Sequence, residues 1–219
     1  VLEEKLQERD LVEETMFFDN DPARAQRIAR AAMWTLHGLL LFTLGLLLWH
    51  AFGLPWALGS LAFLAIEPTV AAHLPVVMTD LPLALTLLVA AVCAGLLATD
   101  WRWRWVAGTG LALGLALGAK HSALAGIAGI VAVLAVAAAW PALRGRPRES
   151  LGRIGKLLLA GLLGLAILWA QYGARFHAGA DGSDGFNRSL PDKIAELSSP
   201  RWRDGIALAD RLQLLPRSY

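Results

Sequence analysis

The chain has 219 residues, of which 56% are hydrophobic and 17% are charged, and its mean hydropathy is +0.51. Soluble domains contain roughly 45–50% apolar residues. Here the excess is concentrated in long runs, so the sequence predicts an all-α, polytopic membrane protein and not a soluble domain. The formal net charge of +2 comes from basic residues spread over loops, so no nucleic-acid partner is indicated.

Residues 1–30 are predicted to form a juxtamembrane segment outside the bilayer. Asp21 is a good N-cap for a helix that has Pro22 at its first position. The chain begins at Val1 and lacks a basic region followed by a short apolar run, so we expect an internal fragment of a longer membrane protein.

Six apolar runs follow, and each is predicted to cross the membrane, because a hydrocarbon core of ~30 Å needs about 20 apolar residues per helix. The fourth run has only ~14 residues, or ~21 Å of helix, so we expect it to pair tightly with the fifth. Residues 31–173 would thus form one helix bundle. The runs lie at about residues 31–52, 56–76, 81–98, 106–119, 122–140 and 157–173.

Glycines in the fourth run recur every four residues, at Gly110, Gly114 and Gly118. A strip of small residues on one helical face lets a neighbouring helix approach closely. We interpret the strip as a packing surface that positions the residue after it, Lys120.

The basic residues of the short loops indicate which way the bundle faces. Lys120 is the only Lys or Arg in the turns near residues 77–80 and 120–121. Because cytoplasmic loops carry an excess of Lys and Arg, the opposite, basic loops are predicted to be cytoplasmic, which leaves Asp80 and Lys120 on the outer face. Residues 1–30 and a final loop at 174–219, with an amphipathic helix around Arg203–Leu215, would also lie outside. The loops at 99–105 and 141–156 hold Arg102, Arg104, Arg144, Arg146, Arg148, Arg153 and Lys156.

Asp80 stands where two apolar runs meet. A carboxylate at a bilayer boundary is costly to keep dry and is usually there for a function, as a base, a metal ligand or an acceptor of a hydroxyl group. It could instead cap the helix that starts at Asp80-Leu81-Pro82, and the two roles are compatible.

Lys120 and His121 lie at the next outer turn. An ammonium group binds phosphate as a point charge, so Lys120 is a candidate for anion recognition. The alternative is a lysine that reaches the interface without a further role. His121 is interpreted as a polar turn residue.

Glu67 lies in the middle of the second apolar run, beside Pro68. An ionisable group at that depth is a functional candidate by default. The alternative interpretation, a neutral, hydrogen-bonded glutamate that partly relieves the kink at Pro68, fits the sequence equally well. His73 follows one to two turns later. His37 and His50 have no carboxylate at helical spacing and are interpreted as packing or interfacial residues.

Several of these runs occur in a specific order. They are Leu64-Ala65-Ile66-Glu67-Pro68-Thr69, then Ala72-His73, then Thr79-Asp80-Leu81-Pro82-Leu83-Ala84, and finally the glycine-rich helix that ends Gly118-Ala119-Lys120. Together they resemble the protein O-mannosyltransferase family (glycosyltransferase family 39). More broadly, they are similar to C-type-fold membrane glycosyltransferases, of which the chain would be a partial membrane domain.

The resemblance implies an enzyme of the bacterial inner membrane that moves a mannose-like sugar from a polyprenyl- or dolichyl-phosphate to an acceptor hydroxyl on the outer face. Asp80 matches an acidic position that lines the catalytic centre, and Lys120 matches a lysine near the donor phosphate. His73 and Glu67 match family positions without an assigned role, and we group them with Lys120 as donor-binding. The family's first-loop acidic pair should precede Val1, so we expect the 219-residue piece alone to be inactive.

Membrane lipid, a polyprenyl-phosphate sugar and a protein or glycolipid acceptor are the expected partners. The sequence leaves the sugar, the acceptor and any dependence on a divalent metal open, and no His/Cys metal spacing is present. One rival interpretation is a transporter or flippase with Glu67, His73 and Asp80 as a proton or ion path. Another is a non-catalytic membrane subunit that binds a partner through its glycine face.

Overall fold

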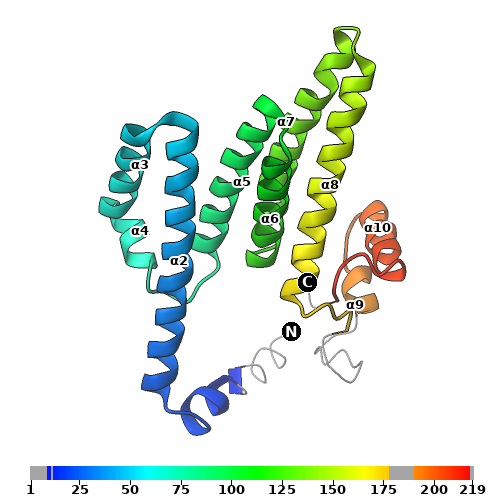
Figure 1. The fold of residues 1–219 in the computed structure, drawn as a ribbon. Coiled ribbons are helices and arrows are strands. Elements are labelled where there is room, and N and C mark those ends of the chain that lie inside the picture. Colours follow the sequence, from blue (N-terminus) through cyan, green and yellow to red (C-terminus); the bar gives the residue numbers. More distant parts are fainter. Residues whose placement is uncertain (1–8, 11, 178–189, 218–219) are drawn as a thin grey trace. The chain divides into compact units, whose positions relative to one another are not determined.

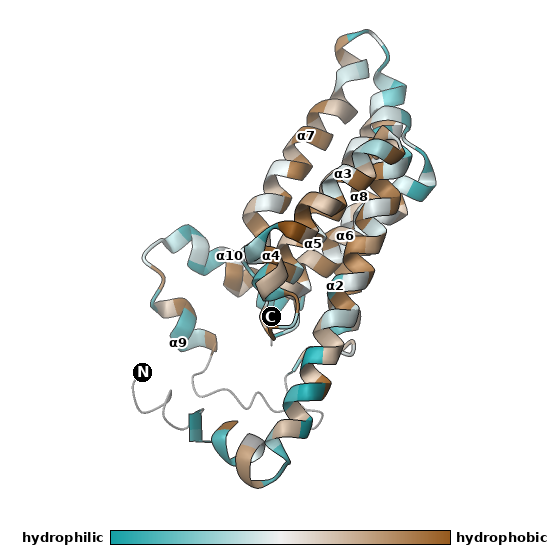
Figure 2. Cartoon of the chain, turned by 90° about the vertical axis from the view of Figure 1, so that its left-hand side faces the viewer, coloured by the Kyte–Doolittle hydropathy of each residue, from teal (hydrophilic) through white to brown (hydrophobic). Residues whose placement is uncertain are grey.

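The computed structural model describes residues 9–10, 12–177 and 190–217, and every regular element in those ranges is a helix (Figure 1). The chain divides into two compact units. The first comprises Glu13–Ile167 and the second comprises Val1–Val12 with Leu168–Tyr219. In Figure 2 apolar residues run along the helices of the first unit, while hydrophilic residues gather at the α7–α8 turn and the start of α2. The all-helical fold and these long apolar helices confirm an all-α membrane protein.

Four helices among the described residues are long and apolar enough to cross a membrane, fewer than the six that were predicted. The predicted run at 106–119 is α6 (Trp103–Ala119), which has 17 residues. The run at 56–76 is broken into α3 (Leu54–Ile66) and α4 (Pro68–His73). The four long helices are α2 (Pro22–Phe52), α5 (Asp80–Asp100), α7 (Ala123–Leu143) and α8 (Pro147–Gln171).

Pro68 explains the break. A proline has no backbone N–H to donate and disfavours helical backbone in the residue before it. Glu67 accordingly has extended backbone, with φ −70° and ψ 119°, and α3 ends at Ile66. Together α3 and α4 lead the chain from the end of α2 back to the start of α5 (Figure 1).

The start of α2 confirms the predicted cap. The Asp21 carboxylate accepts hydrogen bonds from the N–H groups of Ala23 (3.0 Å) and Arg24 (3.2 Å), and Pro22 is the first helical residue. Before that cap, Glu14–Phe18 form a short π-helical turn, η1. Residues 22–30, which were predicted to belong to the juxtamembrane segment, form one continuous helix with the apolar run.

Gly110 and Gly114 of α6 face α8, and the predicted role of the glycine strip in close packing is confirmed at these two positions. A Cβ atom added to Gly110 would lie 2.7 Å from the carbonyl oxygen of Ala160, and one added to Gly114 would lie 2.5 Å from that of Gly164. The fourth run was expected to pair tightly with the fifth, but α6 packs more extensively against α5 than against the following helix, α7.

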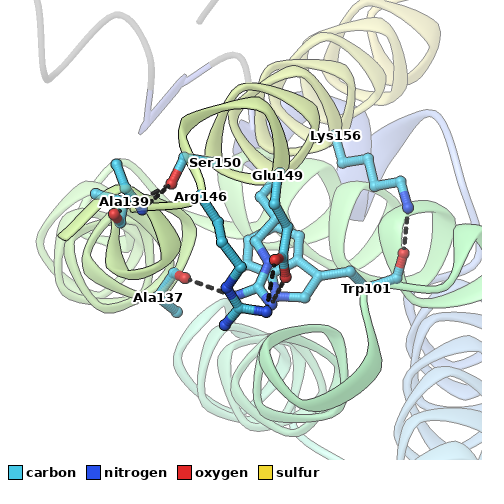
Figure 3. A network of polar contacts seen from close by, with 9 residues as sticks. Trp101, Ala137, Ala139, Arg146, Glu149, Ser150 and Lys156 are labelled. Carbon is cyan, nitrogen blue, oxygen red and sulfur yellow. Dashed lines mark hydrogen bonds and ion pairs between the residues drawn. The ribbon is translucent and has the colours of Figure 1, made fainter. Parts of the chain in front are cut away.

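The two basic segments meet at one end of the first unit (Figure 3). Lys156 donates a hydrogen bond to the carbonyl oxygen of Trp101 (2.6 Å), which follows the last turn of α5. Arg153 binds the carbonyl oxygen of Ala137 (3.0 Å) and the carboxylate of Glu149 (2.6 Å). Residues 147–156 were predicted as part of a loop, yet they form the first turns of α8.

The second unit contains α9 (Leu190–Ala195) and α10 (Pro200–Arg211). The predicted amphipathic helix around Arg203–Leu215 corresponds to α10, which begins and ends earlier. Side-chain hydrogen bonds are among the contacts that join the described residues of this unit. The Trp169 indole donates to the carbonyl oxygen of Leu214 (3.1 Å), and the Arg217 guanidinium binds both carboxylate oxygens of Asp210 (2.9 and 3.2 Å).

Candidate functional site

A cavity of about 360 Å³ lies where α3, α4 and the start of α5 meet. It brings together three of the four predicted site residues, although they come from separate elements of the chain. Four lining residues have polar side chains, one at the start of α5 and three at or within α4, and the rest of the wall is hydrocarbon. The lining residues are Glu67, Thr69, Val70, His73, Met78, Asp80, Leu81 and Ala84.

The fourth predicted residue, Lys120, does not line the cavity but forms an ion pair with Asp80, which does. Lys120 follows the last residue of α6, and its Nζ atom lies 2.6 Å from Oδ1 of Asp80. The side chains of Lys120 and Asp80 are 44% and 60% exposed. An exposed pair contributes at most about 1 kcal/mol to stability, so this contact can open at little cost.

Asp80 is not the cap of α5. The capping residue is Thr79, which makes no side-chain capping bond, and Asp80 is the first helical residue. A carboxylate in this first turn is still favoured by the partial positive charge of the helix N-terminus. The alternative interpretation of Asp80 as a side-chain N-cap is therefore wrong, and its carboxylate is used for the contact with Lys120.

Glu67 caps α4 and lines the cavity at the same time. Its Oε2 atom accepts a hydrogen bond of 2.6 Å from the N–H of Val70. Glu67 is partly buried and stands at the break between two helices, not inside a continuous span as predicted. Glu67 therefore has a structural role, as a helix cap, which differs from the expected alternative of a neutral glutamate that relieves a proline kink.

His73 is the last residue of α4, and its Nδ1 atom lies 2.5 Å from the carbonyl oxygen of Thr69. A carbonyl oxygen can only accept, so Nδ1 carries the proton in this contact. The His73 ring lines the same cavity as the carboxylates of Glu67 and Asp80.

His37 supports this region from α2 and was not predicted as part of it. Its side chain is fully buried, and Nδ1 donates to the carbonyl oxygen of Leu74 at 2.9 Å, just after α4. The partner is a backbone oxygen 37 positions away, so no pattern of side chains in the sequence could reveal it. His50 lies elsewhere, with its ring 5.2 Å from that of Trp105.

Within the described residues, no group of three or more His, Cys, Asp or Glu side chains is arranged to hold a metal ion.

Comparison with known proteins gives one match. The family model described as dolichyl-phosphate-mannose-protein mannosyltransferase matches residues 9–181, a range that includes every lining residue of the cavity and Lys120. Neither the search of curated proteins nor that of solved structures gave a match. The family match gives no support to the rival interpretation as a transporter or flippase.

Proposed function

Since this chain belongs to the dolichyl-phosphate-mannose-protein mannosyltransferase family, we propose that its full-length protein moves a mannose-like sugar from a polyprenyl- or dolichyl-phosphate to an acceptor hydroxyl. The single observation that carries the assignment of the site is the Lys120–Asp80 contact at a cavity that Glu67 and His73 also line. A cation for the donor phosphate and an acceptor of hydroxyl protons thus lie side by side.

We further propose that the bundle crosses the membrane six times, with the cavity on the outer face. The Lys120–Asp80 contact joins the end of α6 to the start of α5, so α6 covers the same depth as α5. Its 17 residues span ~26 Å. With α3 and α4 as one broken crossing, the basic end around Lys156 and Trp101 would face the cytoplasm.

Donor binding would rearrange the pair. The phosphate of the donor lipid competes with Asp80 for the ammonium group of Lys120, and a charge-assisted hydrogen bond to phosphate is at least as strong as one to a carboxylate. Because the pair is exposed, this exchange costs about 1 kcal/mol or less. Asp80 then has a free carboxylate that can accept the hydrogen bond of the incoming hydroxyl group.

In the transfer step the acceptor oxygen forms a bond to the anomeric carbon of the sugar while the bond from that carbon to the phosphate oxygen breaks. The configuration at the carbon inverts, and the electron pair leaves with the polyprenyl phosphate. A general base takes the hydroxyl proton, and Asp80 orients the acceptor or assists that base. Lys120 stabilises the charge that develops on the departing phosphate.

Two variants of the full-length protein test the proposal, with transfer of radiolabelled mannose from a polyprenyl-phosphate donor as the assay. Lys120→Met should raise the KM for the donor by about tenfold to a hundredfold, the range expected for one hydrogen bond to a charged group. Asp80→Asn should lower kcat. Arg148→Met, at the opposite, basic end, is the matched control and should change neither constant.

An Asp80→Asn enzyme that works at the wild-type rate would show that Asp80 has no part in transfer. An unchanged donor KM in Lys120→Met would show that Lys120 does not bind the phosphate.

A further inference from the structure

One end of the first unit carries more positive charge than its own carboxylates neutralise. We call residues 99–105 and 141–156 the basic end, because they contain seven Lys or Arg residues and only two acidic residues. Both carboxylates are already used within the basic end. Asp100 pairs with Arg102 (3.2 Å), and Glu149 pairs with Arg146 (3.0 Å) and Arg153 (2.6 Å).

Other cations of the basic end lie over indole rings. Arg104 and Arg144 are exposed, and neither forms an ion pair within the part of the chain that the structure describes. Tryptophan is enriched at the membrane–water boundary, and a guanidinium stacked on a ring still has N–H groups that can bind a phosphate. The distances from cation to ring centroid are 4.7 Å for Arg104 and Trp105, 5.3 Å for Arg144 and Trp140, and 5.1 Å for Lys156 and Trp103.

These cations stand at two depths. Arg153 binds the carbonyl oxygen of Ala137 on α7 (3.0 Å), and its guanidinium lies 5.3 Å from the ring of Trp101 at the α5–α6 turn. Beyond that level α7 continues to Leu143, and α8 starts again at Pro147. Six residues of helix rise ~9 Å, so the α7–α8 turn projects past the α5–α6 turn (Figure 1). Since the headgroup layer of one leaflet is roughly 5–8 Å thick, the projecting turn is long enough to cross it.

The projecting turn also has uncovered apolar surface. Leu143 and Leu151 are 79% and 71% exposed. On the next turn of α8, a Cβ atom added to Gly152 or Gly155 would meet no atom within 4 Å, so the helix surface beside Lys156 is open. A ligand with a negative headgroup and apolar tails uses both features, whereas a soluble anion would use only the charges.

We propose that the basic end binds an anionic phospholipid, with the headgroup beside the projecting α7–α8 turn and the acyl chains along the start of α8. Lys156 and Arg104, at the level of the α5–α6 turn, bind the headgroup from the hydrocarbon side, and Arg144 binds it from the water side. Guanidinium and ammonium groups form charge-assisted hydrogen bonds to phosphate oxygens. The inference depends neither on sugar transfer nor on which side of the membrane this end faces.

The number of cations sets the expected selectivity. Every phospholipid has a phosphate, but only an anionic one has a net negative charge. Each Lys or Arg near an anionic membrane surface favours it by about fivefold, so Arg104, Arg144 and Lys156 together predict a preference of about a hundredfold over a zwitterionic lipid at low salt. The preference should decrease as salt rises, because the screening length shortens from ~30 Å at 0.01 M to ~3 Å at 1 M.

The test is lipid binding to the purified full-length protein in neutral detergent, followed by native mass spectrometry with phosphatidylglycerol and phosphatidylcholine of identical acyl chains. The wild type should prefer phosphatidylglycerol about a hundredfold. The double variant Arg104→Gln, Arg144→Gln retains only Lys156, so its preference should fall to about fivefold. The matched control is Arg24→Gln, Arg27→Gln, which removes the same charge from exposed arginines at the start of α2 and should keep the wild-type preference.

Equal affinity of the wild type for the two lipids would overturn the proposal. The same holds for a preference that survives in Arg104→Gln, Arg144→Gln, or one that falls equally in the α2 control, because total charge and not the basic end would then decide. Inorganic phosphate in large excess should leave the lipid bound. If phosphate displaces it, the site recognises a soluble anion and the lipid assignment fails.

A measurement on the wild-type protein covers the case in which the double variant does not fold. Phosphatidylglycerol with a photoreactive group in its headgroup should label residues 99–105 or 141–156, and excess unlabelled phosphatidylglycerol should abolish the label while phosphatidylcholine leaves it. Labelling confined to other segments would refute the proposal, as would labelling that both lipids displace equally well.

Discussion

Replacing Gly114 by alanine should push α6 away from α8 and destabilise the bundle. The added Cβ atom would lie 2.5 Å from the carbonyl oxygen of Gly164 and 2.6 Å from Cβ of Ile167, whereas ordinary contacts begin at 3.4 Å. Neither neighbour is the end of a flexible side chain that could turn aside. The helices must therefore separate by about 0.9 Å at this point if α8 takes up the whole displacement.

Two opposing terms set the magnitude of the effect. Overpacking of this kind costs about 1–3 kcal/mol, and alanine gains up to about 1 kcal/mol over glycine in a helix interior. The free energy of unfolding should fall by about 1–2 kcal/mol. Gly161→Ala on α8 is the matched control, since its Cβ atom would meet nothing within 4 Å. Gly161→Ala has the higher helix propensity of alanine without any overpacking, so it should be as stable as the wild type or up to about 1 kcal/mol more stable.

The assay is unfolding in detergent micelles under increasing denaturant, followed by the fluorescence of the nine tryptophans. The decisive result is whether the two glycine-to-alanine substitutions change the free energy of unfolding in different directions. If Gly114→Ala and Gly161→Ala shift the unfolding free energy in the same direction, the close α6–α8 contact does not exist in the membrane protein, and the position of Lys120 has another cause.

Two further substitutions probe the supports of the site and of the basic end. His37→Ala should lower the free energy of unfolding by about 2–4 kcal/mol, because it opens a void and leaves the Leu74 carbonyl unpaired. Proteolysis between residues 74 and 79 should become faster. An unchanged cleavage rate would refute a stabilising role for the His37–Leu74 hydrogen bond. Ser150→Ala should cost about 1–2 kcal/mol, since the Ser150 hydroxyl accepts from the N–H of Ala142 (2.9 Å) and donates to the carbonyl oxygen of Ala139 (3.1 Å). Thr35→Ala, whose exposed hydroxyl binds only its own helix, is the control for both and should fall within about 0.5 kcal/mol of the wild type.

Sequence patterns were sufficient where a local rule decides the structure. The cap at Asp21, the close approach at Gly110 and Gly114, and the apolar helices follow from side-chain type and spacing. The prediction from hydropathy failed at Glu67, because hydropathy is averaged over a window of residues and does not show that Pro68 ends a helix. The mid-span position of Glu67 was lost at this one peptide, and the count of six spans fell to four there and at α6, which has only 17 residues.

The candidate site was predictable in its members but not in its geometry. Asp80 and Lys120 were placed on one face by counting basic residues in loops, and their contact of 2.6 Å follows from the packing of α5 against α6. His37 was missed because its partner is a backbone carbonyl, and every residue has one. Contacts of this kind depend on tertiary structure, which a single sequence does not reveal.

The point at which α6 ends matters as much as the identity of Lys120. The backbone of Lys120 is extended, with φ −167° and ψ 144°, so the side chain leaves the helix instead of continuing its rotation. One more helical residue would turn that side chain by about 100° around the axis and away from Asp80. The glycine contacts with α8 fix where α6 lies, and its end at Ala119 fixes where Lys120 points. If α6 were one residue longer, the lysine would therefore point away from Asp80, and the cavity would lose the cation beside it.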